Sequence, residues 1–162
     1  MYYTTIETPL GWLLLVGEDG ELIELNWPKP TRQAAEAELP AGADESRDSF
    51  GKLPELLRLY FEGKPVDFSD VPVRFSGAGE FEQLSLREAM KTPYGSLTSY
   101  GDIAAAIGSP RAARAVGNAM RKNPTMLIVP CHRVIHSNGK IGGFACGSDI
   151  KRKLLALEGI HL

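Results

Sequence analysis

The chain has 162 residues, 43% of them apolar, and a formal net charge of −2. This composition favours one ordinary domain or two small ones with a real core, and argues against a disordered chain. No apolar run approaches the roughly 20 residues that cross a bilayer, the N-terminal segment lacks the pattern of a signal peptide, and two cysteines cannot form a disulfide framework. We therefore expect a reduced, cytoplasmic protein without membrane contact.

The small net charge hides a difference between the two halves of the chain. Residues 1–79 hold 7 basic and 14 acidic side chains, a net charge of −7, whereas residues 80–162 hold 11 and 6, a net charge of +5. A basic half on an acidic protein indicates a surface that binds a polyanion. A net charge of +5 on about eighty residues is, however, also ordinary for a protein surface. Charge alone leaves the partner open.

The first half of the sequence predicts a small sheet and one helix. Residues 2–27 predict three strands joined by two turns, with Asp19-Gly20 as a two-residue hairpin turn. Residues 29–49 predict a polar loop with one short helical piece, and apolar residues at helical spacing predict a helix over 50–63. A short strand and a linker are expected over 66–80, so we place a domain boundary near residue 77.

The second half is mostly helical. Helices are predicted over residues 79–92, 98–108, 109–123 and 147–159. We expect Thr98 or Ser99 to cap the second of these helices, Ser109 the third, and Ser148 or Asp149 the last. Only Gly108 and Ser109 would then separate the middle pair, which is typical of a helix-turn-helix, although many αα-hairpins share this pattern and bind nothing.

The helix predicted from residue 109 carries cations among small residues. The cations are Arg111, Arg114, Arg121 and Lys122, and the small residues are Ala112, Ala113, Ala115 and Gly117. Guanidinium groups bind phosphates and base edges, and small side chains let a helix lie close to its partner. The same pattern suits a packed helix whose arginines face water. We favour DNA contact because both features follow a tight turn.

One cysteine lies in the stretch "LIVPCHRVIHSNGKIGGF", directly before a histidine. Residues 127–130 predict a short buried strand, and residues 137–139 predict a hairpin turn between 133–136 and 140–144. A thiol beside an imidazole is a candidate nucleophile, because the imidazole can take its proton directly or through one water. Adjacent residues of a strand point to opposite faces, so Cys131 and His132 must lie in a turn to cooperate.

Several interpretations of this thiol stay open. Either Asp149 or Glu158 could supply a carboxylate that orients His132. A zinc site formed with His132, His136 and Cys146 would lack the common ligand spacings. A disulfide or redox pair with Cys146 is geometrically possible. A cysteine hydrolase is compatible with the thiol, but has no need of an arginine-bearing helix-turn-helix.

At this point the sequence resembles a known family. "PCHRV", with "SYGDIAAAIGSPRAARAVGNAMRKNP" before it and "GKIGGF" and "LLALEG" after it, is similar to the O6-alkylguanine-DNA alkyltransferases (methylated-DNA–protein-cysteine methyltransferases) over about residues 80–160. The resemblance implies an α+β fold. A small ribonuclease-H-like α/β domain with an antiparallel sheet would span residues 1–77. A mostly helical domain with the helix-turn-helix would span 78–162, bind DNA and accept the alkyl group.

The resemblance also implies roles for single residues. Cys131 would accept the alkyl group, His132 would deprotonate it through a water, and Glu158 would orient His132. Asn123 would hold the turn before the cysteine. Residues expected around the substrate are Tyr100 at the guanine ring, Arg114 in the vacated base stack, Val134, Gly142, Gly143, Phe144, Ala145 and Cys146. Residues expected on the DNA, with the helix of 110–121 in the minor groove, are Ser99, Arg111, Ala112, Ala113, Arg114, Gly117, Asn118 and Arg121.

The sequence departs from the family in two places. One branch of the family holds zinc in its N-terminal domain, but residues 1–79 contain no cysteine and no histidine, so that site cannot exist here. Ala145 and Cys146 stand where some members carry serine and glycine. The alanine removes a hydroxyl donor to the guanine oxygen, and the second thiol could narrow the pocket or oxidise with Cys131.

The implied activity is the direct repair of DNA. The alkyl group of O6-alkylguanine, with O4-alkylthymine as a second possible substrate, would pass irreversibly to the cysteine after nucleotide flipping. We expect double-stranded DNA with alkylated guanine as partner, a monomer, and no cofactor or metal. The competing hypotheses are a lesion-binding protein, whose relatives carry tryptophan in place of Cys131, and a thiol redox or hydrolytic enzyme.

Overall fold

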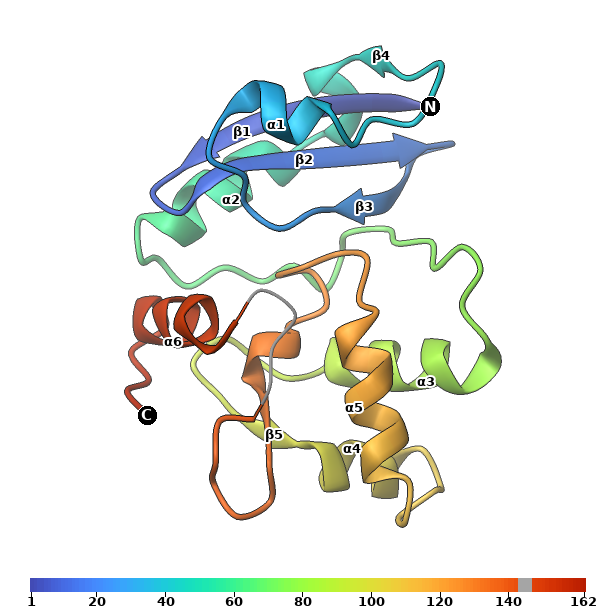
Figure 1. The fold of residues 1–162 in the computed structure, drawn as a ribbon, viewed down its shortest axis with the longest axis vertical. Helices are drawn as coiled ribbons and strands as arrows, with labels where there is room; N and C mark the ends of the chain where they lie inside the picture. Colours follow the sequence, from blue (N-terminus) through green and yellow to red (C-terminus); the bar gives the residue numbers. More distant parts are fainter. Residues whose placement is uncertain (143–146) are drawn as a thin grey trace. The chain divides into compact units, whose positions relative to one another are not determined.

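The structure, a computed structural model, describes residues 1–142 and 147–162. The chain forms two compact units, Met1–Ser76 with Pro124–Met126, and Gly77–Asn123 with Leu127–Leu162. The first unit combines a sheet with helices and the second is mostly helical (Figure 1), which confirms the predicted α+β class. In the part of the chain that the structure describes, no helix is long and apolar enough to cross a membrane.

A four-stranded sheet with the order β3-β2-β1-β4 forms the centre of the first unit. β1 (Tyr2–Thr8), β2 (Gly11–Glu18) and β3 (Glu21–Leu25) are antiparallel neighbours, and the short β4 (Asp44–Glu45) pairs parallel with β1. The predicted turn at Asp19-Gly20 is confirmed. Both residues have positive φ, 52° and 82°, as a two-residue hairpin turn requires.

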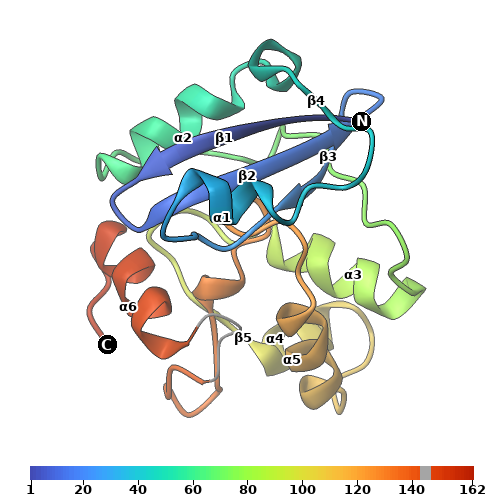
Figure 2. The ribbon, with the colours of Figure 1, turned by 45° about the horizontal axis from the view of Figure 1, so that its top comes forward.

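Helices cover both faces of this sheet. Leu14 and Val16 of β2 pack against Ala35 of α1 (Arg32–Glu36), the short helical piece expected in the polar loop. α2 (Leu53–Phe61) lies on the opposite face (Figure 2). Because side chains alternate along a strand, a strand covered on both faces is buried without interruption, as residues 13–17 are.

The helix predicted over 50–63 is shorter at its start. Residues Arg47–Phe50 form a 3₁₀ turn, η1, and α2 begins at Leu53. Pro54 occupies the first turn, where its missing N–H costs no hydrogen bond, and Gly63 ends the segment with a φ of 80°. Leu57 and Tyr60 supply the fully buried side of the helix.

The strand predicted after α2 does not form. In this described segment the only ladder contact is an isolated bridge between Leu22 and Val73. Pro65 and Pro72 cannot donate to a ladder, and a turn at 69–70 interrupts the run between them. The segment instead joins the sheet through two bonds, from the Leu22 N–H to the Pro72 carbonyl (2.8 Å) and from the Arg74 N–H to the Leu22 carbonyl (3.0 Å).

Three helices pack together in the second unit. They are α3 (Glu80–Ala89), α4 (Tyr100–Ala106) and α5 (Ala113–Arg121). Beside them lie β5 (Thr98–Ser99), which pairs parallel with β6 (Val134–Ile135), the 3₁₀ turn η2 (Cys131–Arg133), and α6 (Ser148–Leu157). The Ser99 hydroxyl caps α4 by accepting the Asp102 N–H at 3.0 Å, as predicted. No side chain caps α6, so the caps predicted at Ser148 or Asp149 are wrong.

The connection between α4 and α5 is longer than predicted. The Ser109 N–H bonds to the Ala104 carbonyl (2.9 Å) and so helps to close α4 instead of capping α5. A further turn follows, in which the Ala112 N–H bonds to the Ser109 carbonyl (2.9 Å). Arg111 and Ala112 therefore precede α5, which begins at Ala113.

Residues 127–130 are buried as predicted, but they form a turn and not a strand. Leu127 has a φ of 69°, in the left-handed region that a strand cannot hold. The predicted turn at 137–139 is present, closed by the bond from the His136 N–H to the Lys140 carbonyl (3.0 Å). The strand before it pairs with β5, and part of the second arm expected for the hairpin, residues 143 and 144, lies outside the described residues.

Candidate active site

Cys131 begins the 3₁₀ turn η2 directly after Pro130. The turn places Cys131 and His132 in the non-extended geometry that cooperation between them requires. The side chain is almost fully buried, with 2% of its surface exposed. Its sulfur accepts a hydrogen bond from the Asn123 side-chain amide at 3.2 Å.

Asn123 ties the end of α5 to the cysteine segment. Besides its bond to the sulfur, its Nδ2 donates to the Val129 carbonyl at 2.9 Å. The bond spans the turn that contains the left-handed Leu127, and it lies in the buried interior, where such a bond is costly to lose. The amide therefore links the shape of this turn to the position of the sulfur.

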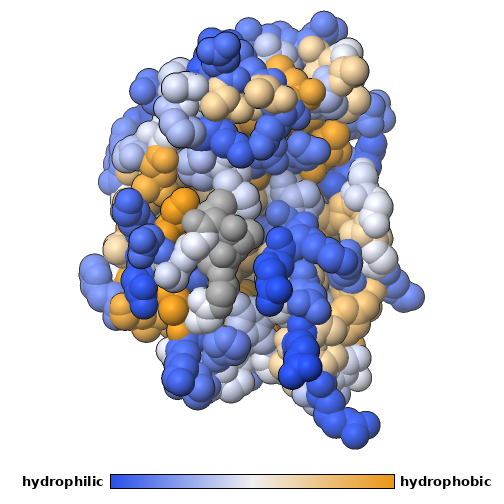
Figure 3. Space-filling view, in the orientation of Figure 1, coloured by the Kyte–Doolittle hydropathy of each residue, from blue (hydrophilic) through white to orange (hydrophobic). Residues whose placement is uncertain are grey.

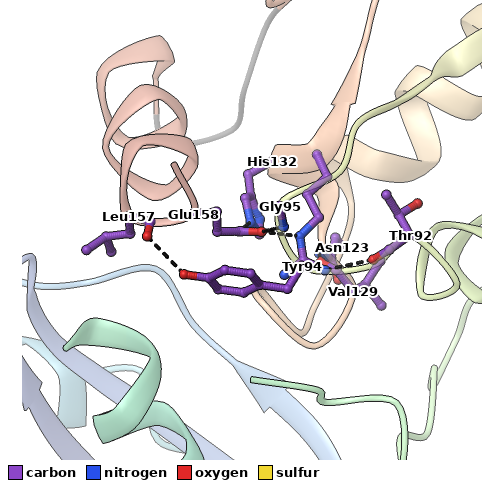
Figure 4. Close-up of polar contacts among 9 residues, drawn as sticks. Thr92, Tyr94, Gly95, Asn123, Val129, His132, Leu157 and Glu158 are labelled. Atoms are coloured by element: carbon purple, nitrogen blue, oxygen red, sulfur yellow. Dashed lines mark hydrogen bonds and ion pairs between the residues drawn. The ribbon is translucent and has the colours of Figure 1, made fainter. Parts of the chain in front are cut away.

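His132 and Glu158 form a buried pair. The His132 Nε2 is hydrogen-bonded to the Glu158 Oε2, and the side chains are 1% and 0% exposed. Glu158 follows the last residue of α6, which brings it beside η2 (Figure 4). Of the two acids considered from the sequence, the structure places Glu158 at the imidazole, whereas Asp149 is exposed at the start of α6.

Glu158 has two further partners on its other oxygen. Its Oε1 accepts the Arg133 Nε–H at 2.7 Å and the Gly95 N–H at 3.0 Å (Figure 4). Arg133 is itself buried and donates through Nη1 to the Thr92 carbonyl at 2.7 Å. The carboxylate is thus held by a cation, a backbone amide and the imidazole at once.

Burial and these partners set the charges of the site. Burial raises the pKa of the Cys131 thiol to about 11 and lowers the pKa of His132. Burial alone would raise the pKa of Glu158, but the His132 hydrogen bond, the Gly95 N–H and the Arg133 charge together lower it to about 2. At neutral pH the site therefore holds a thiol, a neutral imidazole and an ionised carboxylate.

This charge pattern fixes the tautomer of the imidazole. An ionised carboxylate only accepts hydrogen bonds, so the neutral ring donates from Nε2 to Glu158. The lone pair then lies on Nδ1, the nitrogen that can take a proton. With a thiol pKa of about 11, only about one thiol in ten thousand is ionised at pH 7. A base is therefore needed for this thiol to react.

Other predicted substrate residues lie near this centre. Tyr100, the first residue of α4, is buried, and its pKa is raised by burial and by the negative charge of a Cys131 thiolate. Its ring centre lies 5.2 Å from that of the exposed His136, with the two rings tilted by 57°, and the predictions did not place this histidine at the substrate. Gly142 has a φ of 76°, and a Cβ there would lie 3.1 Å from the His136 ring and 3.3 Å from the Tyr100 hydroxyl. Val134 is fully buried in β6.

The predicted DNA residues separate into exposed and covered groups. The exposed ones are Arg111, Arg114, Asn118 and Arg121, and the half-buried ones are Ala112, Ala113 and Gly117. Val116, Ala119 and Met120 form the buried side of α5. Hydrophilic side chains cover the visible surface over this helix (Figure 3). Ser99 is buried and its hydroxyl is used to cap α4.

Four predicted pocket residues, Gly143, Phe144, Ala145 and Cys146, lie outside the described residues. The hypotheses of a disulfide and of a zinc site that use Cys146 fall there too. Among the residues that are described, no three cysteine, histidine or acidic side chains are grouped to hold a metal ion.

Sequence reasoning missed two buried cations of this site, Arg133 and Lys151. Lys151 is fully buried and donates to the Val134 carbonyl at 2.6 Å. A signal for it existed. Residues 151, 154, 155 and 158 follow the i, i+3, i+4, i+7 spacing of one helix face. Since 154 and 155 are leucines, that face predicts burial for the lysine as well.

The depressed pKa of Glu158 predicts acid sensitivity. The folded-state pKa of about 2 lies below the ordinary carboxyl value, so the stabilisation is present above about pH 5 and is lost as the pH falls towards 2. We expect Glu158 to contribute on the order of 3 kcal/mol to the free energy of unfolding at pH 7. Urea unfolding at pH 7, 5 and 3.5 measures this loss. The loss of the free energy of unfolding between pH 7 and 3.5 should be smaller in Glu158→Gln. Asp149→Asn should show the pH dependence of the wild type.

The fold and the site together define a class of protein: one unit with a sheet and helices, and a second, mostly helical unit that holds a buried cysteine and a histidine–carboxylate pair. Comparison with known families assigns that class. Residues 1–75 match the 6-O-methylguanine DNA methyltransferase ribonuclease-like domain, and residues 80–160 match the DNA binding domain of the same family. The chain belongs to the 6-O-methylguanine DNA methyltransferase family.

Individual relatives agree with this assignment over nearly their whole length. The chain is 42% identical to the methylated-DNA–protein-cysteine methyltransferase of Methanosarcina acetivorans, over 98% of this chain and 99% of the relative. It is 39% identical to the protein of that name from Mycobacterium tuberculosis, over 98% and 92%. Among solved structures, M. tuberculosis OGT in complex with DNA matches with a TM-score of 0.83 and 38% identity, over 98% of this chain and 92% of that one.

Proposed function

We propose that this chain repairs DNA by taking the alkyl group of O6-alkylguanine onto Cys131, irreversibly and once per molecule. The observation that carries the proposal is the charge arrangement around the buried thiol. A neutral imidazole follows the thiol in the same turn, and an ionised Glu158 fixes its tautomer. The family and a relative solved in complex with DNA supply the substrate class.

The second unit, with a boundary near residue 77, is the DNA-binding and acceptor domain in this proposal, and the first unit is structural. The turn before α5 and α5 itself meet the minor groove. Arg111, Arg114, Asn118 and Arg121 are exposed there for phosphates and base edges. Ala112, Ala113 and Gly117 add little bulk, which suits a narrow groove.

The alkylated oxygen is hidden in a base pair, so the nucleotide must leave the stack. The exposed Arg114 fills the vacated space and offsets part of the cost, which is a few kcal/mol. We expect the flipped base to enter a pocket that Tyr100, Val134 and Gly142 line, with the Tyr100 hydroxyl at the ring of the guanine. Residues 143–146, also expected at this pocket, lie outside the described residues.

The chemical step needs no other reactant. The Cys131 proton passes to His132, directly or through one water, and the imidazolium is stabilised by Glu158. The sulfur attacks the alkyl carbon, the carbon–oxygen bond breaks, and its electron pair leaves with the guanine, which takes up a proton. A thioether remains. Because no reversible step of cysteine chemistry removes it, each molecule acts once.

In the experiment the protein, which we propose to be a monomer, is incubated with a tenfold excess of duplex DNA that contains one O6-methylguanine. Loss of the lesion should stop at one equivalent per protein. Continued turnover would indicate a catalytic hydrolase or redox enzyme and contradict the proposal. Tight binding with no loss would indicate a lesion-binding protein. A parallel duplex with O4-methylthymine tests the second substrate.

A further inference from the structure

A lysine lies in the interior of the second unit, near enough to Cys131 for its charge to lower the pKa of the thiol. Lys151 has no exposed surface and is among the largest fully buried side chains. A buried ammonium is costly unless its surroundings use it, and lysine is one of the residues that is almost never fully buried alone. Its position therefore requires an explanation from the groups around it.

Those groups belong to the active site. The Lys151 Nζ donates to the Val134 carbonyl at 2.6 Å, and Val134 directly follows η2, the turn that carries Cys131. The same nitrogen lies 5.9 Å from the centre of the Tyr100 ring, which favours a cation over its face. The lysine thus contacts both a residue next to the cysteine turn and the aromatic ring expected at the substrate.

The same face of α6 carries the two opposite charges of the site. Lys151 and Glu158 are seven positions apart, with the buried Leu154 and Leu155 between them on that face. α6 packs on η2, so one helix delivers the carboxylate to His132 and the ammonium to the region of Cys131. Because both side chains extend from the same end-to-end helical face, the position of α6 against η2 sets the positions of both charges.

We propose that Lys151 is a positioning residue for alkyl transfer, whose ammonium stabilises the Cys131 thiolate as it forms and fixes the Val134 carbonyl beside it. The inference rests on the proposed function of Cys131 as acceptor. The titratable groups that face the ammonium are Cys131 and His132 from η2 and Tyr100 from α4. A positive charge favours the thiolate and keeps the imidazole unprotonated, so that it can accept the thiol proton.

The charge of Lys151 is itself sensitive to pH. Burial lowers the pKa of Lys151 to about 8, and a negative charge on Cys131 opposes this effect. The side chain is therefore mostly an ammonium at pH 7, and becomes neutral as the pH rises above about 8. As the pH rises above about 8, the loss of the Lys151 charge should slow the reaction. Over the same pH range, the ionisation of the thiol alone would make the reaction faster.

The test compares three variants with the wild type, after thermal melts select those that fold. Lys151→Met removes the charge at similar length, Lys151→Arg keeps it at all pH values, and the exposed Lys153→Met on the same helix controls for net charge. Single-turnover transfer from an O6-methylguanine duplex is followed between pH 6.5 and 9.5. A second arm without DNA measures the modification of Cys131 by iodoacetamide, by peptide mass spectrometry.

We expect Lys151→Met to be about tenfold slower in both arms at pH 7, the effect of one unit in the thiol pKa. The wild type and Lys153→Met should share a downward bend of the rate near pH 8, which Lys151→Met and Lys151→Arg lack. Lys151→Arg should be faster than Lys151→Met. A Lys151→Met variant with the wild-type rates, or a slower one that keeps the bend, would overturn the inference.

The two arms separate this inference from the proposed function. If the wild type transfers no methyl group but the iodoacetamide arm depends on Lys151, the proposed function fails, and with it the role in alkyl transfer, while the effect of the lysine on the Cys131 thiol stands. If transfer occurs and neither arm depends on Lys151, the inference fails alone.

Discussion

Replacing Cys131 by serine is expected to abolish alkyl transfer and to leave DNA binding intact. A serine hydroxyl is a far weaker nucleophile than a thiolate, and the His132 base cannot make up the difference. The substitution removes little volume from a buried position, so the fold should persist. Transfer from a radiolabelled O6-methylguanine duplex should fall below detection, and the retardation of that duplex in a gel should remain.

Cys146→Ser provides the control for the second thiol. That variant keeps the proposed acceptor, so it should still take up one methyl group per molecule, whatever its rate. Transfer that survives in Cys131→Ser and disappears in Cys146→Ser would move the acceptor to the other cysteine and refute the assignment.

Replacing Glu158 by glutamine is expected to slow transfer by about 10²–10⁴-fold. A glutamine has nearly the same shape, but its amide N–H can donate a hydrogen bond to the His132 Nε2. The carboxylate of Glu158 can only accept a hydrogen bond from that nitrogen. The imidazole would then carry its proton on Nδ1 and could not take the proton of the thiol. The substitution also leaves the buried Arg133 without its anion, so some loss of stability should accompany the loss of rate.

A pH profile of folded protein distinguishes the loss of the base from a loss of stability. Single-turnover rates are measured on protein that is shown to be folded by circular dichroism, with Asp149→Asn as a matched acid-to-amide change on the exposed end of α6. The control should behave as the wild type. Glu158→Gln should gain rate as the pH rises, because hydroxide replaces the missing base. A folded Glu158→Gln protein with the wild-type rate at pH 7 would contradict the role of the pair.

Much of the active site was accessible from the sequence. The "PCHRV" stretch predicts a reactive cysteine with a neighbouring base, and its place in a turn follows from the requirement that both side chains reach one site. The choice between Asp149 and Glu158 was not accessible from the residues alone. It depends on where α6 ends relative to η2, a distance that no local pattern contains.

The predictions failed where tertiary contacts override local preference. Residues 127–130 are apolar enough for a strand, but Asn123 binds the Val129 carbonyl and the chain turns through Leu127. Ser109 has the pattern of an N-cap, but its N–H is used to close α4. Lys151 lies in a run of three basic residues, and only the helix period distinguishes it from its exposed neighbours.

The buried thiol of Cys131 is the proposed acceptor of the alkyl group. The most direct measurement is peptide mass spectrometry after incubation of the protein with an equimolar O6-methylguanine duplex. We expect the peptide with Cys131 to gain one methyl group, in step with the loss of the lesion from the DNA. A methyl group on any other residue, or loss of the lesion with no gain in protein mass, would contradict it.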